Sequence, residues 1–537
     1  MNRMTVKKAN STTPLLPLAM MAVTLLLAAT AHAAAPGIRG NLTSGIGSSS
    51  FNLVASAAYT TQPDGSAIYS WGYGCAPSTT PVFAPTMPNN ACPQMQTPGP
   101  TLILTQGQTY TIRLTNNLPT AAGNTSILFP GFNVTATGGV AGLLTQEAAP
   151  GGFVVYTLTA SSPGTRSYYS GTQGDLQVEM GLYGAIIVVP STSPGCPARN
   201  THAGIDPADI SGTTTLANGE RDFRLAPAAY NNAKTCYDRE YLFQWSEMDP
   251  GIHRQAEEQA GRTCTGCMSV ATEPYHPAYF MVNGRSMPDL MDPNYASQFP
   301  HQPYNGNPHM HPGDQVLLRI IGQGRWQHPF HEHGNHVRIL ARDGNLILSA
   351  TDPNSLAGPL LFTTTTTPGQ AMDGIYYYTG KGLNWDMYGH NPGSTDPSAL
   401  LTCTPDANGY NTGASAANKI NYYEWCQDHN KPVQATPTGD VAGGGPVTLP
   451  DPNIFANGPW YGGSPYLGPN ATVRAVGSTG TTPPSGTVAN APTGEAGFSF
   501  MWHSHNEREI TTNNIFPGGM LMMMLVDSRE FAIDESN

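Results

Sequence analysis

The amino-acid sequence predicts an all-β fold with two β-sandwiches in tandem, and three observations support this. Short segments of alternating apolar and polar residues recur along the chain, whereas helix-period patterns are scarce. The order of strands and turns in residues 97–189 returns in residues 279–526, which indicates an internal repeat. Only 11% of the residues are charged, against about 25% in ordinary soluble domains. Gly, Pro, Ser, Thr and Asn therefore carry much of the surface, as in loop-rich β proteins.

The first copy of the repeat is marked by glycine or proline turns, each followed by a strand. The second strand alternates Tyr, Ile and Leu with polar residues, so it is expected to be half-buried. The last strand is apolar throughout, so it is expected to be buried on both faces. The four expected strands cover residues 101–104, 109–117, 153–159 and 181–189.

The second copy repeats these strands and adds one that carries histidines. The expected strands cover residues 279–285, 313–320, 328–336, 374–379 and 518–526. A long insertion at about 380–494, rich in Gly, Pro, Asn and Thr, interrupts this copy. We therefore expect a leader (1–33), a first domain (34–190), a linker (191–237) and a second domain (238–530).

Residues 1–33 have the three parts of a secretory signal peptide. A basic start is followed by the apolar run Leu15–Ala29 and by the small-residue cleavage site Ala31-His32-Ala33. The protein is therefore expected to be exported, to the periplasm or to the extracellular space. No other long apolar run is present in the sequence, so membrane insertion is not expected.

The chain is acidic, with a formal charge of −12. Removal of a leader that holds three basic and no acidic residues would make the charge more negative still. This disfavours nucleic acids and anionic membranes as partners, because both attract basic surfaces. An oligomer is possible, but the sequence does not define one.

The chain contains eight cysteines, and an even number in an exported protein favours disulfides. Pairing in sequential order is the simplest arrangement: 75–92, 196–236, 264–267 and 403–426. Cys264-Thr265-Gly266-Cys267 could instead be a redox or zinc element, but no second pair accompanies it, so a disulfide in a surface loop is preferred.

Two His-x-His triplets define the candidate metal site. Side chains alternate faces along a strand, so His331 and His333 should point the same way, and likewise His503 and His505. Two such strands side by side would bring four imidazoles together, and imidazole suits copper, zinc, iron or nickel. His328 and Ser504 would share the opposite face.

A third triplet, His309-Met310-His311, precedes Pro312-Gly313 and is therefore expected in a solvated turn rather than in a metal site.

At these residues the chain resembles the multicopper oxidases, which are built from cupredoxin-like Greek-key β-sandwiches. The resemblance includes the strands at 97–117 and 181–189, Asn283-Gly284-Arg285, and the specific motif His-Pro-x-His-x-His-Gly at 328–334. It implies that four histidines match ligands of the trinuclear copper cluster that reduces dioxygen: His331, His333, His503 and His505. It also implies that His328 matches a ligand of the type 1 copper and that Met520 falls near its axial ligand, so these two are weaker candidates.

The departures from the family pattern reduce the expected metal content. Ser504 stands where the family has its type 1 cysteine, and a blue copper centre needs that thiolate. The family's next histidine is missing from Asn506–Glu509, and the first-domain histidines are missing from Leu128–Gly131 and Tyr169–Gly171. We therefore expect one or two copper ions, not four.

The sequence leaves two functions open. The first is a copper-binding member of the family, which, if active, would be a copper-dependent oxidase of a small-molecule reductant with dioxygen. The second is a non-catalytic copper carrier or a structural surface protein on a degenerate oxidase scaffold. Glu332, Glu507 and Glu509 could act as proton donors or extra ligands, although solvated carboxylates are the simpler expectation, and His336 is expected to be structural. No catalytic residue is assigned.

Overall fold

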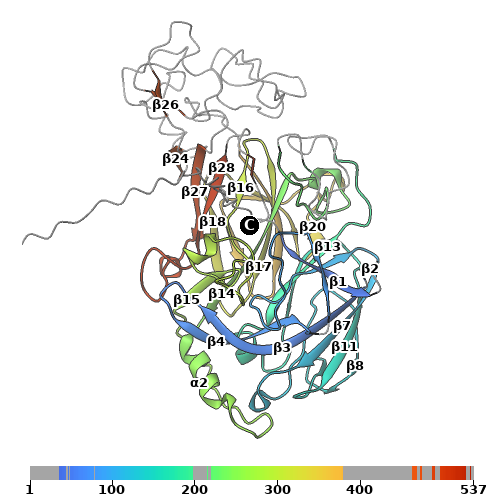
Figure 1. Ribbon diagram of the computed structural model, residues 1–537. Coiled ribbons are helices and arrows are strands. Elements are labelled where there is room, and N and C mark those ends of the chain that lie inside the picture. The colour runs from blue at the N-terminus through green and yellow to red at the C-terminus, as the bar shows by residue number, and fades with distance from the viewer. Residues whose placement is uncertain are drawn as a thin grey trace, which may run out of the picture.

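The computed structural model (Figure 1) describes residues 35–43, 46–47, 49–77, 79–196, 215, 219–378, 463–467, 472–474, 487–489, 496–527 and 532–533. The expected signal peptide, most of the expected insertion and the pair Cys403 and Cys426 lie outside these residues. No helix of the described residues is long and apolar enough to cross a membrane.

The first unit is a sandwich of two sheets, drawn in blue and teal in Figure 1. One sheet contains β1 (Gly37–Thr43), β2 (Ile46–Gly47), β5 (Pro81–Ala84), β6 (Leu102–Thr105), β12 (Gly164–Tyr169) and β13 (Tyr183–Val189). The other contains β3 (Ser50–Thr61), β4 (Ala67–Cys75), β7 (Thr109–Asn116), β8 (Val134–Gly138) and β11 (Phe153–Thr159). A hairpin adds β9 (Val140–Ala141) and β10 (Gln146–Glu147).

The second unit is also a sandwich. One sheet contains β14 (Arg239–Met248), β15 (Tyr279–Val282), β17 (Gln315–Gly322), β19 (Val337–Arg342), β20 (Asn345–Leu346), β21 (Leu360–Leu361) and β23 (Ala371–Tyr377). The other contains β16 (His309–Met310), β18 (His328–Glu332), β22 (Thr363–Thr366), β24 (Gly463–Leu467), β27 (Ala496–Ser504) and β28 (Leu521–Asp527). A separate pair is β25 (Thr472–Arg474) with β26 (Thr487–Ala489).

The two units share one topology. In the first, the strand order is β4-β3-β7-β11-β8, and in the second it is β15-β14-β17-β23-β19. The facing sheets match as well, because β12-β13-β6 corresponds to β27-β28-β16. The pairing directions agree at each step: β3 with β7 and β14 with β17 are parallel, as are β13 with β6 and β28 with β16. The expected all-β fold of tandem sandwiches is confirmed.

The core of the second unit holds the strand of the first triplet in place. Phe330 of β18 is fully buried between the two sheets, with its ring centroid 4.6 Å from that of Trp245 and 5.9 Å from that of Trp502. Burial of large aromatic side chains of this kind stabilises the packing by about 2–3 kcal/mol each. Since Phe330 points inward, its neighbour His331 must point out of the sandwich.

One helix was not anticipated from the sequence. Helix α2 (Pro250–Ala260) lies between β14 and β15, and the Asp249 side chain caps it by accepting a hydrogen bond from the Gly251 N–H at 2.8 Å. Its Ile252 and Ala256 pack into the core of the first unit. Asp249-Pro250 is a typical helix N-terminal signal. The helix was nevertheless missed, because it is short and its apolar stripe is weak. The other helices of the described residues are short: η1 (Thr120–Ala122), α1 (Gly174–Gln177), η3 (Ala233–Thr235), η4 (Asp289–Met291) and η6 (Glu507–Ile510).

Disulfides and a buried ion pair hold segments that were expected to be loops. The disulfides Cys75–Cys92, Cys196–Cys236 and Cys264–Cys267 are confirmed, the last in an exposed loop. The C-terminal part of the expected linker is packed rather than free, because the Asp222–Arg224 ion pair in it is buried.

Candidate metal centre

The two triplets meet on neighbouring antiparallel strands. His331 of β18 lies directly opposite His503 of β27, and Phe330 lies opposite Ser504. However, β18 ends at Glu332 and β27 ends at Ser504. The expectation that both histidines of each triplet lie on a regular strand is therefore wrong. His333 and His505 occupy bends just beyond the strand ends.

The four histidines nevertheless form one cluster. The ring of His331 lies 4.9 Å from that of His333, 5.6 Å from that of His503 and 4.7 Å from that of His505, measured between centroids. His503 lies 5.1 Å from His333 and 5.6 Å from His505. Residues more than 160 positions apart in the chain are thus brought into direct contact by the β18–β27 pairing.

Hydrogen bonds orient two of these rings. Nδ1 of His503 lies 2.6 Å from the Ser504 carbonyl oxygen, to which it can donate its proton, so that Nε2 presents its lone pair. This Nε2 lies 3.2 Å from Nε2 of His333. Nδ1 of His331 lies 2.7 Å from the Thr363 hydroxyl. Partners of this kind on the far nitrogen are what orient metal-binding histidines in proteins.

The bend that carries His333 is held by two side chains and one glycine. The Trp502 indole N–H and the Tyr376 hydroxyl each donate to the His333 carbonyl oxygen at 3.0 Å. Gly334 has φ +97°, and a Cβ at this position would collide with the Tyr376 hydroxyl. The glycine of the His-x-His-Gly motif is therefore required by the backbone, since other residues rarely adopt this conformation.

Burial lowers the pKa of two of these imidazoles. Desolvation, followed by the neighbouring His333, His505 and His503, lowers the pKa of His331 to about 4. Desolvation also lowers the pKa of His503. Only a neutral imidazole can donate a lone pair to a metal ion, so the lowered pKa values of His331 and His503 favour metal binding near neutral pH.

The donor chemistry fits a copper ion, but the rings do not yet form a coordination sphere. Two nitrogens bound tetrahedrally to one ion at about 2.0 Å are about 3.3 Å apart, and the facing nitrogens of His333 and His503 are 3.2 Å apart. Within the described residues, however, no group of three or more His, Cys, Asp or Glu side chains is arranged so that it could hold a metal ion. The rings would have to turn to bind one.

The opposite face of the same strands is a buried ionic network rather than a metal site. His328 is fully buried, with Nε2 2.9 Å from Glu247 Oε2 and Nδ1 2.9 Å from Glu509 Oε2. The second contact is too poorly aligned for a hydrogen bond and is ionic. Burial alone would lower the pKa of His328, but the two glutamates outweigh it and raise this pKa to about 9.

Ser504 belongs to this inner network, as its position on the strand predicts. Its hydroxyl donates to Glu509 Oε2 at 2.5 Å, so His328 and Ser504 meet at one carboxylate. Met520, the other weaker candidate, is fully buried in the apolar core of the second unit.

The candidate carboxylates differ in exposure. Glu332 and Glu509 are buried, which corrects the expectation that they are solvated, whereas Glu507 is exposed. Desolvation raises the pKa of Glu332 well above its ordinary value.

The inner network extends to residues that the sequence did not reveal. Glu247 accepts hydrogen bonds from the backbone N–H groups of Arg325 and Trp326, at 2.6 and 2.9 Å. The Tyr275 hydroxyl bridges Glu247 at 3.2 Å and Glu179 at 2.7 Å, and desolvation raises the pKa of Glu179 to about 8. Glu179 belongs to the first unit. No local motif could have linked these residues, because they meet only in the folded chain.

The third triplet is also placed differently from expectation. His309 and His311 are buried rather than solvated. His309 Nδ1 lies 2.8 Å from Asp527 Oδ2, and His311 Nε2 lies 2.5 Å from Glu220 Oε1. These histidines join the C-terminal strand to the segment before β14, so their contacts are structural.

The first unit has the same strand pairing without histidines. Leu128 and Tyr169 pair at its equivalent edge, where the Leu128 N–H donates to the Tyr169 carbonyl oxygen at 2.7 Å. The Ser170 hydroxyl donates to Gln177 Oε1 at 2.6 Å. The side chains at this edge are apolar, hydroxyl or amide groups, which are poor ligands for copper.

Residues 91–193 match the sequence model of the family described as multicopper oxidase. A laccase of Aspergillus fumigatus is 27% identical over 238 residues, which is 43% of this chain but only 35% of that laccase. The match therefore spans about a third of the length of this relative.

Solved structures are similar over most of the chain. A multicopper oxidase named mgLAC has a TM-score of 0.43 at 14% identity and covers 89% of this chain and 86% of its own. A blue copper oxidase from Nitrosomonas europaea has a TM-score of 0.43 at 13% identity, with 89% and 85% covered. The match to the multicopper oxidase family model lies within the first unit.

Proposed function

We propose that the chain binds copper through His331, His333, His503 and His505, as a reduced site with one or two ions and without a blue type 1 centre. The observation that carries the proposal is the gathering of four imidazoles from two paired strands, with the facing nitrogens of His333 and His503 3.2 Å apart. Copper is the metal of this family. His333 and His505 lie in bends beyond the strand ends, and His505 is exposed.

The most specific function that this site supports is a copper-dependent oxidoreductase acting on a small reductant. Bound copper would supply one-electron chemistry toward dioxygen. Burial lowers the pKa of His331 and His503, the Ser504 carbonyl orients His503, and Thr363 orients His331. His328 has both nitrogens beside carboxylates, so it is proposed to stabilise the fold rather than to bind metal.

The alternative is a copper carrier or a structural surface protein without catalysis. It is favoured by Ser504, since a serine hydroxyl is a poor substitute for the thiolate through which a blue copper centre passes electrons. Export to the periplasm or the extracellular space remains a proposal for either function, because it depends on residues 1–33.

Oxygen uptake separates the two functions. The mature chain would be loaded with copper, freed of excess ion, and assayed with a phenolic reductant in an oxygen electrode. An oxidase consumes oxygen in proportion to bound copper and loses this activity in a His331→Ala, His503→Ala variant. A carrier retains its copper but consumes oxygen no faster than that variant does.

A further inference from the structure

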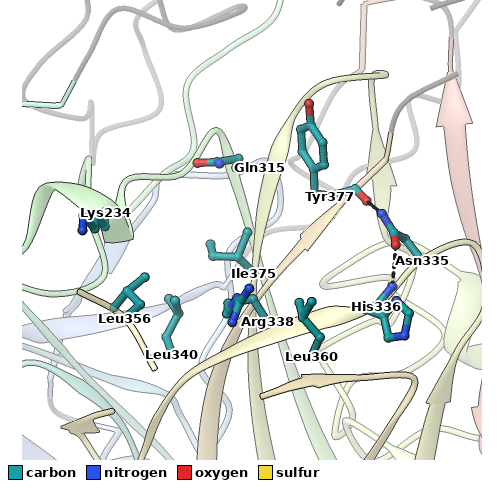
Figure 2. A pocket seen from close by; sticks show the side chains of 10 residues that line it. All are labelled: Lys234, Gln315, Asn335, His336, Arg338, Leu340, Leu356, Leu360, Ile375 and Tyr377. Carbon is teal, nitrogen blue, oxygen red and sulfur yellow. Dashed lines mark hydrogen bonds between the residues drawn. The ribbon is translucent and has the colours of Figure 1, made fainter. Parts of the chain in front are cut away.

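A pocket on the second unit lies outside the histidine cluster and combines an apolar floor with positive charge (Figure 2). It encloses about 380 Å³, within the usual range for small-molecule sites. Leu340 and Ile375 form part of its floor, and Leu360 contributes a side chain that is 51% exposed. Arg338 and Lys234 supply the two cationic groups.

The strand register places the arginine between apolar neighbours. Arg338 of β19 pairs with Ile375 of β23 on one side and with Leu360 of β21 on the other. Figure 2 shows Arg338 among Leu340, Leu360 and Ile375, so its guanidinium has apolar neighbours. A charge next to apolar walls is less screened by water than one on an open surface, so an opposite charge there is bound more strongly.

The arginine is matched by a carbonyl group and not by a carboxylate. Arg338 Nη1 donates to the Gly358 carbonyl oxygen at 2.7 Å, and the ion pairs found among the described residues do not include Arg338. Lys234 donates to the Ser355 hydroxyl at 3.3 Å. Hydrogen bonds from Ser355 and Asn354, and then the nearby charge of Lys234, lower the pKa of Asp352. Lys234 is thus partly compensated, and Arg338 provides the stronger anion site. This contrast is notable in a chain with a formal charge of −12.

We propose that this pocket binds a small organic anion with an apolar body, such as an aryl carboxylate. Arg338 would take the carboxylate, because the planar guanidinium matches two carboxylate oxygens. Leu340, Leu360 and Ile375 would cover the ring. None of the four clustered histidines lines the pocket, so the proposal does not depend on copper binding.

Isothermal titration of the mature, copper-free chain with three probes tests the proposal. Benzoate carries both features, benzyl alcohol lacks the charge, and inorganic phosphate lacks the apolar body. Benzoate is expected to bind at least about tenfold more tightly than either of the others. Its carboxylate contributes a charge-assisted hydrogen bond, and its ring contributes buried apolar area. Equal binding of phosphate, or no benzoate binding up to about 10 mM, would overturn the proposal.

Two variants and one control locate the site. Arg338→Gln is expected to weaken benzoate binding about tenfold or more, since it removes a charge-assisted hydrogen bond. Arg342→Gln removes the same charge from an exposed position of the same strand and should leave binding unchanged. Leu360→Ser, an exposed substitution that spares the core, should weaken benzoate but not phosphate. Equal effects of the two arginine variants would place the anion elsewhere and refute the assignment.

Discussion

The two units of this protein have the same strand pairing at one edge of the sandwich, but the side chains at that edge differ in chemistry. In the first unit, Leu128 pairs with Tyr169 at the end of β12, and in the second, His331 pairs with His503 near the end of β27. The strand order and the pairing directions agree, although only the second edge carries imidazoles. The backbone arrangement therefore does not depend on metal ligands. Function in this fold comes from the side chains grafted on the edge, not from the edge itself.

The largest expected difference between the two edges is in copper binding. A His331→Ala, His503→Ala variant should lose essentially all bound copper, because it removes two of the four proposed ligands, including the ring at the centre of the cluster. The matched change in the first unit, Leu128→Ala with Tyr169→Phe, should retain it. Metal analysis after copper loading measures both. Equal copper content in the two variants would refute the assignment to the second unit.

The inner face should be the most sensitive to loss of a charge. Glu247→Gln is expected to lower the free energy of unfolding by about 3 kcal/mol, since it leaves the buried His328 with one carboxylate partner in place of two. Urea unfolding measures this effect. The same substitution at the exposed Glu258 should change stability by less than about 0.5 kcal/mol. A small effect at Glu247 would mean that His328 is buried without charge.

The pH dependence of stability should report the same ionic contact. The pKa of His328 is raised to about 9 in the folded chain, against about 6.5 when unfolded. The stabilisation is therefore complete below about pH 6.5 and is lost as the pH rises toward 9. We expect a loss of about 2 kcal/mol between pH 7 and 9. In Glu509→Gln this loss should be smaller, and an unchanged pH profile would contradict the account.

The smallest expected difference is between the stability costs of replacing two glycines. Gly334 and Gly65 both have positive φ, but a Cβ at Gly65 would meet nothing within 4 Å. Gly65→Ala should cost about 1 kcal/mol from backbone strain alone. Gly334→Ala should cost about 2 kcal/mol, since the Tyr376 hydroxyl must also move away from the His333 carbonyl oxygen. Thermal unfolding compares them, and equal costs would show that the bend at His333 is loosely packed.

The sequence was informative where a local pattern determines structure. Alternation located β7 and β11 closely, and the repeat of turns anticipated the shared topology of the two units. The period of two also predicted that His328 and Ser504 lie on one face, and they meet at the Glu509 carboxylate. These features depend on neighbours in the chain, so a single sequence contains them.

Features that depend on long-range packing were missed or wrong. The strands end before His333 and His505, because the bend at Gly334 is set by contacts with Tyr376 and Trp502. Glu247 and Glu179 reach the inner network from other strands and from the other unit. His309 and His311 are buried against the acidic partners Asp527 and Glu220. Their burial was missed because these partners are distant in the sequence. No local sequence pattern near these residues predicts such partners.

The central claim is a copper site on the second unit that lacks a type 1 centre. The most direct test is the copper content of the mature chain after loading, read together with its visible and paramagnetic-resonance spectra. The account predicts one or two copper ions per chain, nitrogen ligation in the resonance spectrum and no intense blue band. A chain that retains no copper would refute the metal site. An intense blue band would show that a thiolate binds copper, and the interpretation of Ser504 and His328 would be wrong.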